Sequence, residues 1–459
     1  MVISGCRNRF LRPLIFIFCL SLVDQTGFGH FREESLCSSE ANLSHELFLC
    51  NGQQAKKEQP ALTKEEVLSD VSMRISPEFK IDDSIRNRVS FWFDVYTYYD
   101  SQKSVMHHTD FPWIIFKVLD HTEVMSRPKA RWVNQTKANA TTQAELYKLK
   151  NQIAGLIKKS KFKRFNRSQL NDDEKNIVNQ LLTLPGNLTS NLIRAHKNIR
   201  VQTGQKDFFI KGIQESQDYM KTMENVFLQY RLPIELARLP MVESSFNSKA
   251  TSKAGAAGIW QFMPSTGKKF MMITDQIDER RSPFKSTEAA AELLKENYLL
   301  FQNWALALTA YNHGPGGLRV AIRKVKSREI SDIISKYESK IFAFAGQNYY
   351  CEFLAALYAE KYALEVYGNI FKSEKLEFEK VELLGGLRPN LIMSWLDLSK
   401  DDFVKMNPDI KLAIKQNKIL PRGFGLYLTP NLAFDFRGQQ KKYFEDMKKS
   451  LKIRRVADM

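Results

Sequence analysis

The sequence predicts a mainly α-helical protein with a small α+β unit near its C-terminal end. Apolar residues recur at three- and four-residue steps over residues 207–230, which is the spacing of an amphipathic helix. Strand patterns are sparse over residues 201–370, whereas a glycine-containing turn and a proline-bounded apolar run over 420–430 indicate a strand. With 459 residues, 43% apolar and 26% charged, the chain suits about two to four folded domains.

Further helices follow in the central part of the chain. Pro233 opens one that ends at Glu243, because proline is well tolerated at the first helical position. Ser286 or Thr287 provides the N-cap of the next. Two more helices are predicted over residues 304–311 and 347–367.

The first 29 residues have the pattern of a secretory signal peptide. Three arginines precede an apolar run over residues 14–23, which is too short to span a bilayer as a helix. An uncleaved anchor stays open as an alternative. We therefore predict an exported protein of the periplasm or cell envelope, secreted or in peripheral association with the membrane or cell wall. Residues 30–75, polar and weakly periodic, are predicted to be a leader or linker.

Residues 76–200 are predicted to be a helical N-terminal region. Its aromatic stretch over residues 91–99 favours core packing over a sugar-binding platform, and a polar, basic stretch over 125–175 interrupts the helical pattern. His107 and His108 have no metal-ligand spacing to other residues, so we expect them at the surface.

The cysteines suggest two different environments. Cys37 and Cys50 lie close together in sequence, and in an oxidising compartment they form a disulfide or stay as free thiols. Cys351 sits in an apolar run and is predicted to be a buried small residue.

The net charge of +17 leaves two interpretations open, an anionic partner or a solvated basic surface. No helix-turn-helix, zinc finger or aromatic-basic sheet motif is present, so nucleic acid is not a predicted partner. Metal-ligand, nucleotide-binding and serine-hydrolase motifs are absent from the sequence as well, and we predict neither a metal nor a cofactor.

Three motifs within residues 236–318 indicate chemistry on a carbohydrate. They are Glu243-Ser244, the glycine- and aromatic-rich segment 255–267, and an Ala-Tyr-Asn-His-Gly segment that begins at residue 310. Cleavage of a glycosidic bond requires a proton for the leaving oxygen, and most glycosidases divide the work between two carboxylates. The motif-bearing stretch offers Glu243 alone, because Asp278 and Glu279 adjoin arginines and are predicted to form ion pairs that fix a loop.

The order and spacing of these motifs resemble the catalytic domain of the soluble-lytic-transglycosylase superfamily, especially the membrane-bound transglycosylase D type, over residues 201–370. The resemblance implies a lysozyme-like fold and cleavage of the MurNAc–GlcNAc β-1,4 bond in peptidoglycan strands. It implies that Glu243 acts first as acid and then as base, which leaves a 1,6-anhydroMurNAc end. Burial among apolar neighbours raises the pKa of such an acid in the required direction.

The resemblance also implies which residues contact the substrate. The family's fourth motif is a glutamate-threonine pair before a tyrosine, whereas here Ala345-Gly346 occupies that place, so either Tyr349 or Tyr350 is the matching tyrosine. The predicted substrate-binding residues are Ser252, Gln261, Phe262, Met263, Tyr311, Asn312 and Tyr349.

Two alternative functions stay open. A hydrolytic muramidase would need a partner for Glu243, and Asp275, Asp278 and Glu279 are the candidates in this stretch. A non-catalytic peptidoglycan-binding protein is the other alternative, against which the intact Glu243 argues.

The C-terminal segment changes character after residue 371. A short helical pattern that ends at Asn407-Pro408, followed by a glycine turn and a strand, resembles the second half of a LysM carbohydrate-binding module. Residues 371–440 are therefore predicted to be a degenerate LysM-like domain or an unrelated structural cap. Residues 441–459 form a basic tail.

Overall fold

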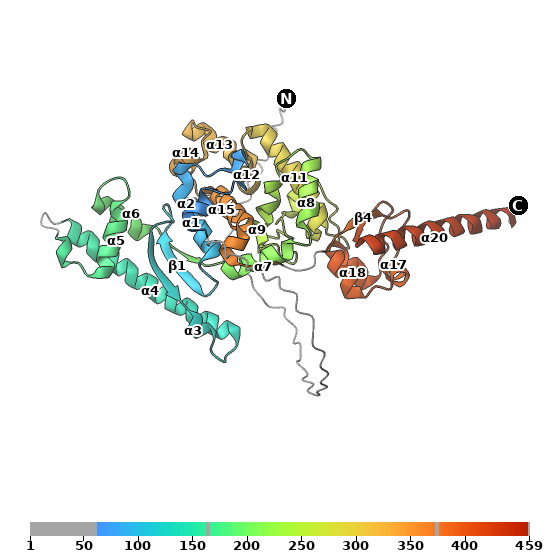
Figure 1. Ribbon diagram of the computed structural model, residues 1–459, viewed down its shortest axis with the longest axis horizontal. Helices are drawn as coiled ribbons and strands as arrows, with labels where there is room; N and C mark the ends of the chain where they lie inside the picture. The colour runs from blue at the N-terminus through green and yellow to red at the C-terminus, as the bar shows by residue number, and fades with distance from the viewer. Residues whose placement is uncertain (1–61, 162–165, 372–375, 458–459) are drawn as a thin grey trace, which may run out of the picture.

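The computed structural model describes three ranges of the chain, 62–161, 166–371 and 376–457, with side chains to residue 450. The predicted signal peptide, most of the leader and the pair Cys37 and Cys50 lie outside these ranges. Helices dominate the described residues, and the strands there form two small sheets (Figure 1), so the mainly α-helical prediction is confirmed. None of the helices in the described ranges combines the length and apolar character needed to cross a membrane.

The central part is a bundle of helices around α15 (Phe344–Lys361). Residues 348–359 of α15 are all buried, and α2 (Asp83–Thr97) packs along this helix (Figure 1). The aromatic stretch that contains α2 is mostly buried in the same core as the apolar residues of α15, which confirms the prediction of core packing. Cys351 is also buried there, as predicted.

Other elements of the central part are α1 (Lys64–Leu68), η1 (Pro77–Phe79), α7 (Lys206–Ser216), α8 (Met220–Gln229), η3 (Ile234–Arg238), α9 (Leu239–Ser244), α10 (Pro264–Gly267), η4 (Glu279–Arg281), α11 (Pro283–Phe301), α12 (Trp304–His313), α13 (Pro315–Val325), α14 (Ile330–Lys336) and α16 (Ala363–Tyr367).

The single helix predicted over residues 207–230 is in fact two helices. α7 and α8 are separated at residues 217–219. Tyr219 packs there against the rings of Phe284 and Phe378, from α11 and the C-terminal segment. Helical periodicity carries no information about such a long-range contact, so the break could not be predicted.

The start of α11 also differs from the prediction. Its N-cap is Ser282, whose side chain accepts a hydrogen bond from Lys285 N. Ser286 and Thr287 lie inside the helix, and each hydroxyl donates to a backbone carbonyl one turn earlier. A hydroxyl residue in the first turn of a helix is therefore not always its cap.

A separate unit is inserted between α2 and α7. It contains β1 (Lys103–His108), β2 (Ile115–Asp120), α3 (Thr122–Met125), α4 (Arg131–Ser160), η2 (Arg167–Gln169), α5 (Asp172–Leu182), α6 (Leu188–Lys197) and β3 (Ile199–Thr203). The strands pair antiparallel in the order β2-β1-β3, and the unit has its own apolar core. The basic stretch predicted to interrupt the helices is largely the 30-residue α4.

The position of His107 and His108 corrects a prediction. Both are fully buried in the central strand β1, not exposed. Burial lowers the pKa of His107 to about 3 and that of His108 to about 4, so both rings are neutral. β1 is covered by β2 on one edge and β3 on the other, and the local sequence does not show this pairing.

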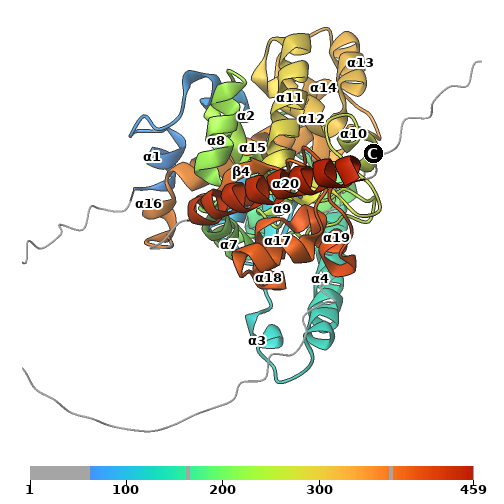
Figure 2. The same ribbon diagram turned by 90° about the vertical axis from the view of Figure 1, so that its right-hand side faces the viewer.

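The C-terminal unit is a two-stranded sheet with helices between its strands. It contains β4 (Glu379–Glu382), α17 (Pro389–Leu396), α18 (Lys400–Met406), η5 (Pro408–Ile410), α19 (Lys411–Gln416), β5 (Gly425–Leu428) and α20 (Pro430–Ala457). β4 and β5 are antiparallel, with Glu379 opposite Leu428. The predicted basic tail falls largely in α20, which extends away from the other elements (Figures 1 and 2).

This unit is fastened to the central part through buried polar contacts. Lys285 of α11 forms a 2.7 Å ion pair with Asp409, and both side chains are buried. Asn407, the residue predicted to end a helix, donates to Tyr427 O and accepts from Tyr427 N at 2.9 and 2.8 Å. The ring of Tyr427 stacks on Phe284 of α11.

Candidate active site

Glu243 lies at the end of the short helix α9. Pro240 occupies the first turn of α9, and Ser245 and Phe246 adopt left-handed backbone conformations that end the helix. The hydroxyl of Ser244 donates to Ile259 O at 2.9 Å, which ties this helix end to the following loop. The carboxyl group of Glu243 is thereby held at a fixed point beside the loop.

The surroundings of Glu243 favour its protonated form. Its side chain is 8% exposed, and its Oε1 accepts a hydrogen bond from the hydroxyl of Tyr349. Burial raises the pKa of Glu243 to about 7, although the Tyr349 hydrogen bond acts in the opposite direction. The predicted direction of the pKa shift is confirmed, and the group can both give and take a proton near neutral pH.

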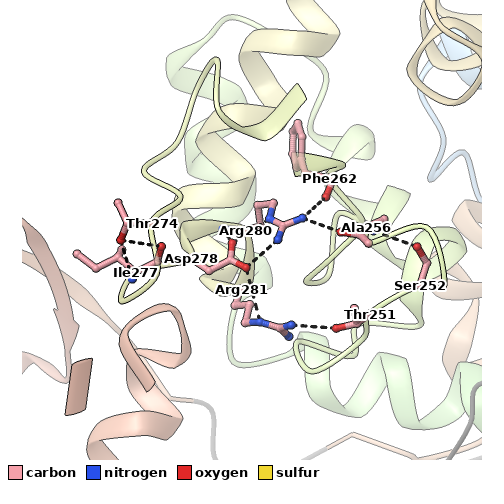
Figure 3. A network of polar contacts seen from close by, with 10 residues as sticks. Thr251, Ser252, Ala256, Phe262, Thr274, Ile277, Asp278, Arg280 and Arg281 are labelled. Atoms are coloured by element: carbon pink, nitrogen blue, oxygen red, sulfur yellow. Dashed lines mark hydrogen bonds and ion pairs between the residues drawn. The ribbon is translucent and has the colours of Figure 1, made fainter. Parts of the chain in front are cut away.

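The glycine-rich loop packs tightly against η4. Gly258 has a φ of +77°, and an added Cβ would lie 1.8 Å from the Arg280 carbonyl oxygen, so only glycine fits. Arg280 donates to Gly255 O at 2.8 Å and to Phe262 O at 3.0 Å (Figure 3). One arginine side chain therefore holds both ends of the loop.

Of the ion pairs predicted with the neighbouring arginines, that of Asp278 is present, whereas Glu279 pairs with a lysine instead. Arg280 binds Asp278 through two nitrogens, and Arg281 bonds to Thr251 (Figure 3). Glu279 pairs with Lys285 at 3.1 Å. Asp278 and Glu279 are thus engaged in fixing the loop.

The predicted substrate-binding residues of the loop occupy different positions along it. Ser252 is partly exposed, and its hydroxyl accepts from Ala256 N at 3.0 Å. Gln261 has a φ of +48° and donates to Gly258 O at 2.8 Å. Phe262 is buried, and Met263 is partly exposed at the start of α10.

Tyr311 and Tyr349 approach the site from two different helices. The Tyr311 hydroxyl on α12 donates to Trp260 O at 2.9 Å, and Trp260 itself is fully buried. Burial first, and then the charge of Glu243, raises the pKa of both tyrosines well above the usual value. The tyrosine that bonds to Glu243 is Tyr349 and not its neighbour Tyr350.

A pocket of about 40 Å³ lies beside Glu243. This volume is large enough to hold water. Of the predicted site residues, Glu243, Asn312 and Tyr349 line it, whereas Ser252, Gln261, Phe262, Met263 and Tyr311 do not. The lining consists of Trp92, Tyr96, Arg200, Gln202, Gln205, Val242, Glu243, Asn312, Phe344, Ala345, Tyr349 and Glu352.

Two contributions to this pocket were not predicted from the sequence. The first is Glu352 of α15, a second buried carboxyl beside Glu243. It is the sole charged residue of segment 344–359, and this isolation in an apolar helix could have identified it. The second is the strand β3 with the two residues after it, from which Arg200, Gln202 and Gln205 reach the pocket. Their sequence contains no corresponding signal.

Comparison with known protein families finds a match over the part of the chain that contains Glu243 and the loop. The family profile described as the transglycosylase SLT domain matches residues 229–334, a range that includes Glu243, the loop and Tyr311. Residues 229–334 form a transglycosylase SLT domain. Within the soluble-lytic-transglycosylase superfamily, this range is similar to enzymes of the membrane-bound transglycosylase D type.

Individual relatives support the assignment of the SLT domain. Membrane-bound lytic murein transglycosylase D of Escherichia coli K12 is 39% identical over 115 residues, 25% of each chain. A transglycosylase of the bacteriophage PRD1 is 30% identical over 129 residues, which are 28% of this chain and 46% of the phage protein. The chain thus matches about a quarter of the length of the E. coli enzyme.

A solved structure is also similar. The 70 kDa soluble lytic transglycosylase of Escherichia coli aligns with 55% of this chain and 38% of its own, at 16% identity and a TM-score of 0.29. Arg200, Gln202 and Glu352 all lie outside the range matched by the SLT domain profile.

Proposed function

We propose that this protein is a lytic transglycosylase that cleaves the MurNAc–GlcNAc β-1,4 bond of peptidoglycan strands. The observation that carries the proposal is Glu243, a buried carboxyl with a pKa of about 7, within an SLT domain and hydrogen-bonded to Tyr349. An acid with this pKa is half protonated at neutral pH. It is therefore suited to both halves of an acid–base reaction.

Glu243 acts twice in the proposed mechanism. Its proton goes to the glycosidic oxygen, which leaves with the electron pair of the broken bond, and positive charge develops at the anomeric carbon. The resulting carboxylate then takes the proton of the muramyl C6 hydroxyl, whose oxygen bonds to the anomeric carbon. No water is consumed, Glu243 regains its proton, and the product carries a 1,6-anhydroMurNAc end.

The loop and the two tyrosine-bearing helices supply the proposed sugar-binding residues. Ser252 and Met263 are partly exposed along the loop, and Asn312 lies beside the acid. Gln261 and Phe262 shape the loop next to these residues through their backbone conformation and burial. Tyr349 would keep the carboxylate in place while its charge changes, and Tyr311 would hold the loop through Trp260 O.

A hydrolytic muramidase is the second candidate, and Glu352 favours it. The pocket next to Glu243 contains this second carboxyl and has room for a water molecule. Asp278 and Glu279, candidates for that role in the sequence, are bound to Arg280 and Lys285 instead. The two reactions differ in the product, so mass spectrometry of digested sacculi tests the proposal. New ends one water lighter than hydrolysis products support transglycosylation, and ends with the full mass of a reducing sugar contradict it.

The C-terminal unit is proposed to be a LysM-like module that holds the enzyme on the glycan. Its support is the order of elements, with helices α17 to α19 between two antiparallel strands. The buried Lys285–Asp409 contact supports the alternative, a structural cap. The export signal in the sequence and the membrane-bound name of the E. coli relative support a place in the cell envelope.

Removal of the C-terminal unit distinguishes a glycan-binding module from a structural cap. A chain that ends at residue 371 should cleave soluble glycan fragments but sediment less with insoluble sacculi. Lys285→Met is included in that shortened chain, because the truncation otherwise leaves a buried cation without Asp409. Equal sedimentation of the full and shortened chains would identify the unit as a structural cap.

A further inference from the structure

Glu352 is the second carboxyl group in the pocket that contains Glu243. It follows Tyr349 by three residues on α15, so both side chains project from the same face of this helix. Its side chain is 8% exposed, like that of Glu243, and both line the same 40 Å³ pocket. The proposed acid–base role of Glu243 does not by itself require a second carboxyl at this buried position.

The groups that face Glu352 come from four elements. α9 contributes Glu243, α2 contributes Tyr96, α15 contributes Tyr349, and β3 contributes Arg200. Burial raises the pKa values of Tyr96 and Tyr349 well above normal, and the charge of Glu352 raises them further. The hydroxyl groups of both tyrosines therefore stay neutral.

The thiol next to Glu352 in sequence is neutral as well. Burial raises the pKa of Cys351 to about 12. The phenol of Tyr311 is close to Glu243, and it too stays neutral. The two carboxyls are therefore the groups of this pocket that change charge near neutral pH, and Arg200 supplies the fixed positive charge.

Two carboxyls in one buried pocket do not ionise independently. Burial and then the charge of Glu243 raise the pKa of Glu352 to about 8, while Arg200 acts in the opposite direction. Burial, opposed by the Tyr349 hydrogen bond, brings the pKa of Glu243 to about 7. Because the two groups interact, these two steps belong to the pair, which binds two protons below both steps and a single proton between them.

We propose that Glu352 shares a proton with Glu243 and so extends the pH range over which Glu243 can act as the general acid. Glu352 is a positioning residue in this scheme, because it acts through Glu243, with which it lines the pocket. The inference rests on the proposed function, in which Glu243 donates the proton.

The consequence appears on the alkaline side of the pH profile. When the pair holds one proton, a negative charge on Glu352 stabilises that proton on Glu243. In Glu352→Gln this charge is absent, so Glu243 titrates alone. The alkaline limb of kcat/KM should therefore move to lower pH, by about half a unit to one unit. On the acidic plateau, where both carboxyls are protonated in the wild type, activity should stay within about threefold.

The variant Glu360→Gln is the matched control. Glu360 lies on the same helix as Glu352 but binds Arg238 outside the pocket. Its alkaline limb should coincide with that of the wild type. An unchanged limb in a folded Glu352→Gln protein overturns the proposal, and so does an equal loss of activity at every pH, which is the signature of a purely structural role.

A second measurement does not depend on activity. The carboxyl C=O stretch of Glu352, followed by difference infrared spectroscopy with Glu352→Gln as reference, should titrate at a lower pH in Glu243→Gln than in the wild type. The interaction between the two carboxyls acts equally on both. Removing the charge of Glu243 should therefore lower the pH at which Glu352 titrates. If Glu352 titrates at the same pH in both proteins, the two carboxyls do not share a proton. The infrared titration does not require glycan cleavage. It can therefore contradict the shared proton without contradicting the proposed function.

Discussion

The hydroxyl of Tyr349 on α15 donates a hydrogen bond to Oε1 of Glu243 on α9, across 106 residues of sequence. This bond joins the end of a short helix to the largely buried helix α15. It fixes the orientation of the proposed acid and lowers its pKa, while burial raises it. The balance between the two effects gives Glu243 a pKa of about 7.

Glu243→Gln should lower sacculus digestion by at least about 100-fold, because the amide cannot deliver a proton. Its stability should not suffer. Glu243 has a pKa of 4.5 in an ordinary environment and about 7 in the fold, so the wild type loses stability as pH rises through this window. The glutamine variant lacks that loss and should melt at or above the wild-type temperature at pH 8. Glu296→Gln, on the exposed face of α11, is the control. Full digestion by a folded Glu243→Gln protein would remove Glu243 from the mechanism.

Digestion in heavy-oxygen water should leave the new glycan ends unlabelled and resistant to borohydride. The muramyl C6 hydroxyl is tethered to the reacting ring, so its attack has a large effective concentration relative to an unpositioned water. Hen egg-white lysozyme on the same sacculi provides labelled, reducible ends as a reference. Labelled and reducible ends from this protein would make it a muramidase.

Tyr349→Phe should move the alkaline limb of kcat/KM to higher pH, in the direction opposite to Glu352→Gln. The hydrogen bond from Tyr349 lowers the pKa of Glu243, so its loss lets burial raise that pKa above about 7. The maximal rate should fall as the carboxyl loses its fixed orientation. Tyr350→Phe, which removes the hydroxyl of the adjacent buried tyrosine, is the control. An equal shift of the alkaline limb of kcat/KM in both variants would assign the shift to packing.

Gly258→Ala should destabilise the loop and the fold by about 2 kcal/mol or more. The methyl group would meet the Arg280 carbonyl at 1.8 Å, and the residue has a positive φ. Gly316→Ala is the matched control, because an added Cβ at Gly316 has no neighbour within 4 Å. Thermal unfolding of both variants measures the difference, and equal melting temperatures would show that the loop relaxes around the methyl group.

Helix periodicity and motif spacing were sufficient for the class of fold and for the central residue of the site. The amphipathic patterns placed α9, α12 and α15 approximately, and a carboxylate next to a glycine-rich loop indicated Glu243. These are local properties, since the spacing of apolar residues and the conformational freedom of glycine operate within a few residues.

Tertiary structure alone decided which other side chains share the pocket with Glu243. Glu352 and Arg200 approach it from α15 and β3, which are distant from α9 in sequence, and the buried position of His107 depends on strands that pair across an inserted unit. The break between α7 and α8 has the same origin in the packing of Tyr219. Burial and electrostatic coupling depend on the neighbours that the fold brings together. The sequence therefore indicated Glu243 as the proposed acid, while the fold determined the pKa of this group and its second carboxyl neighbour.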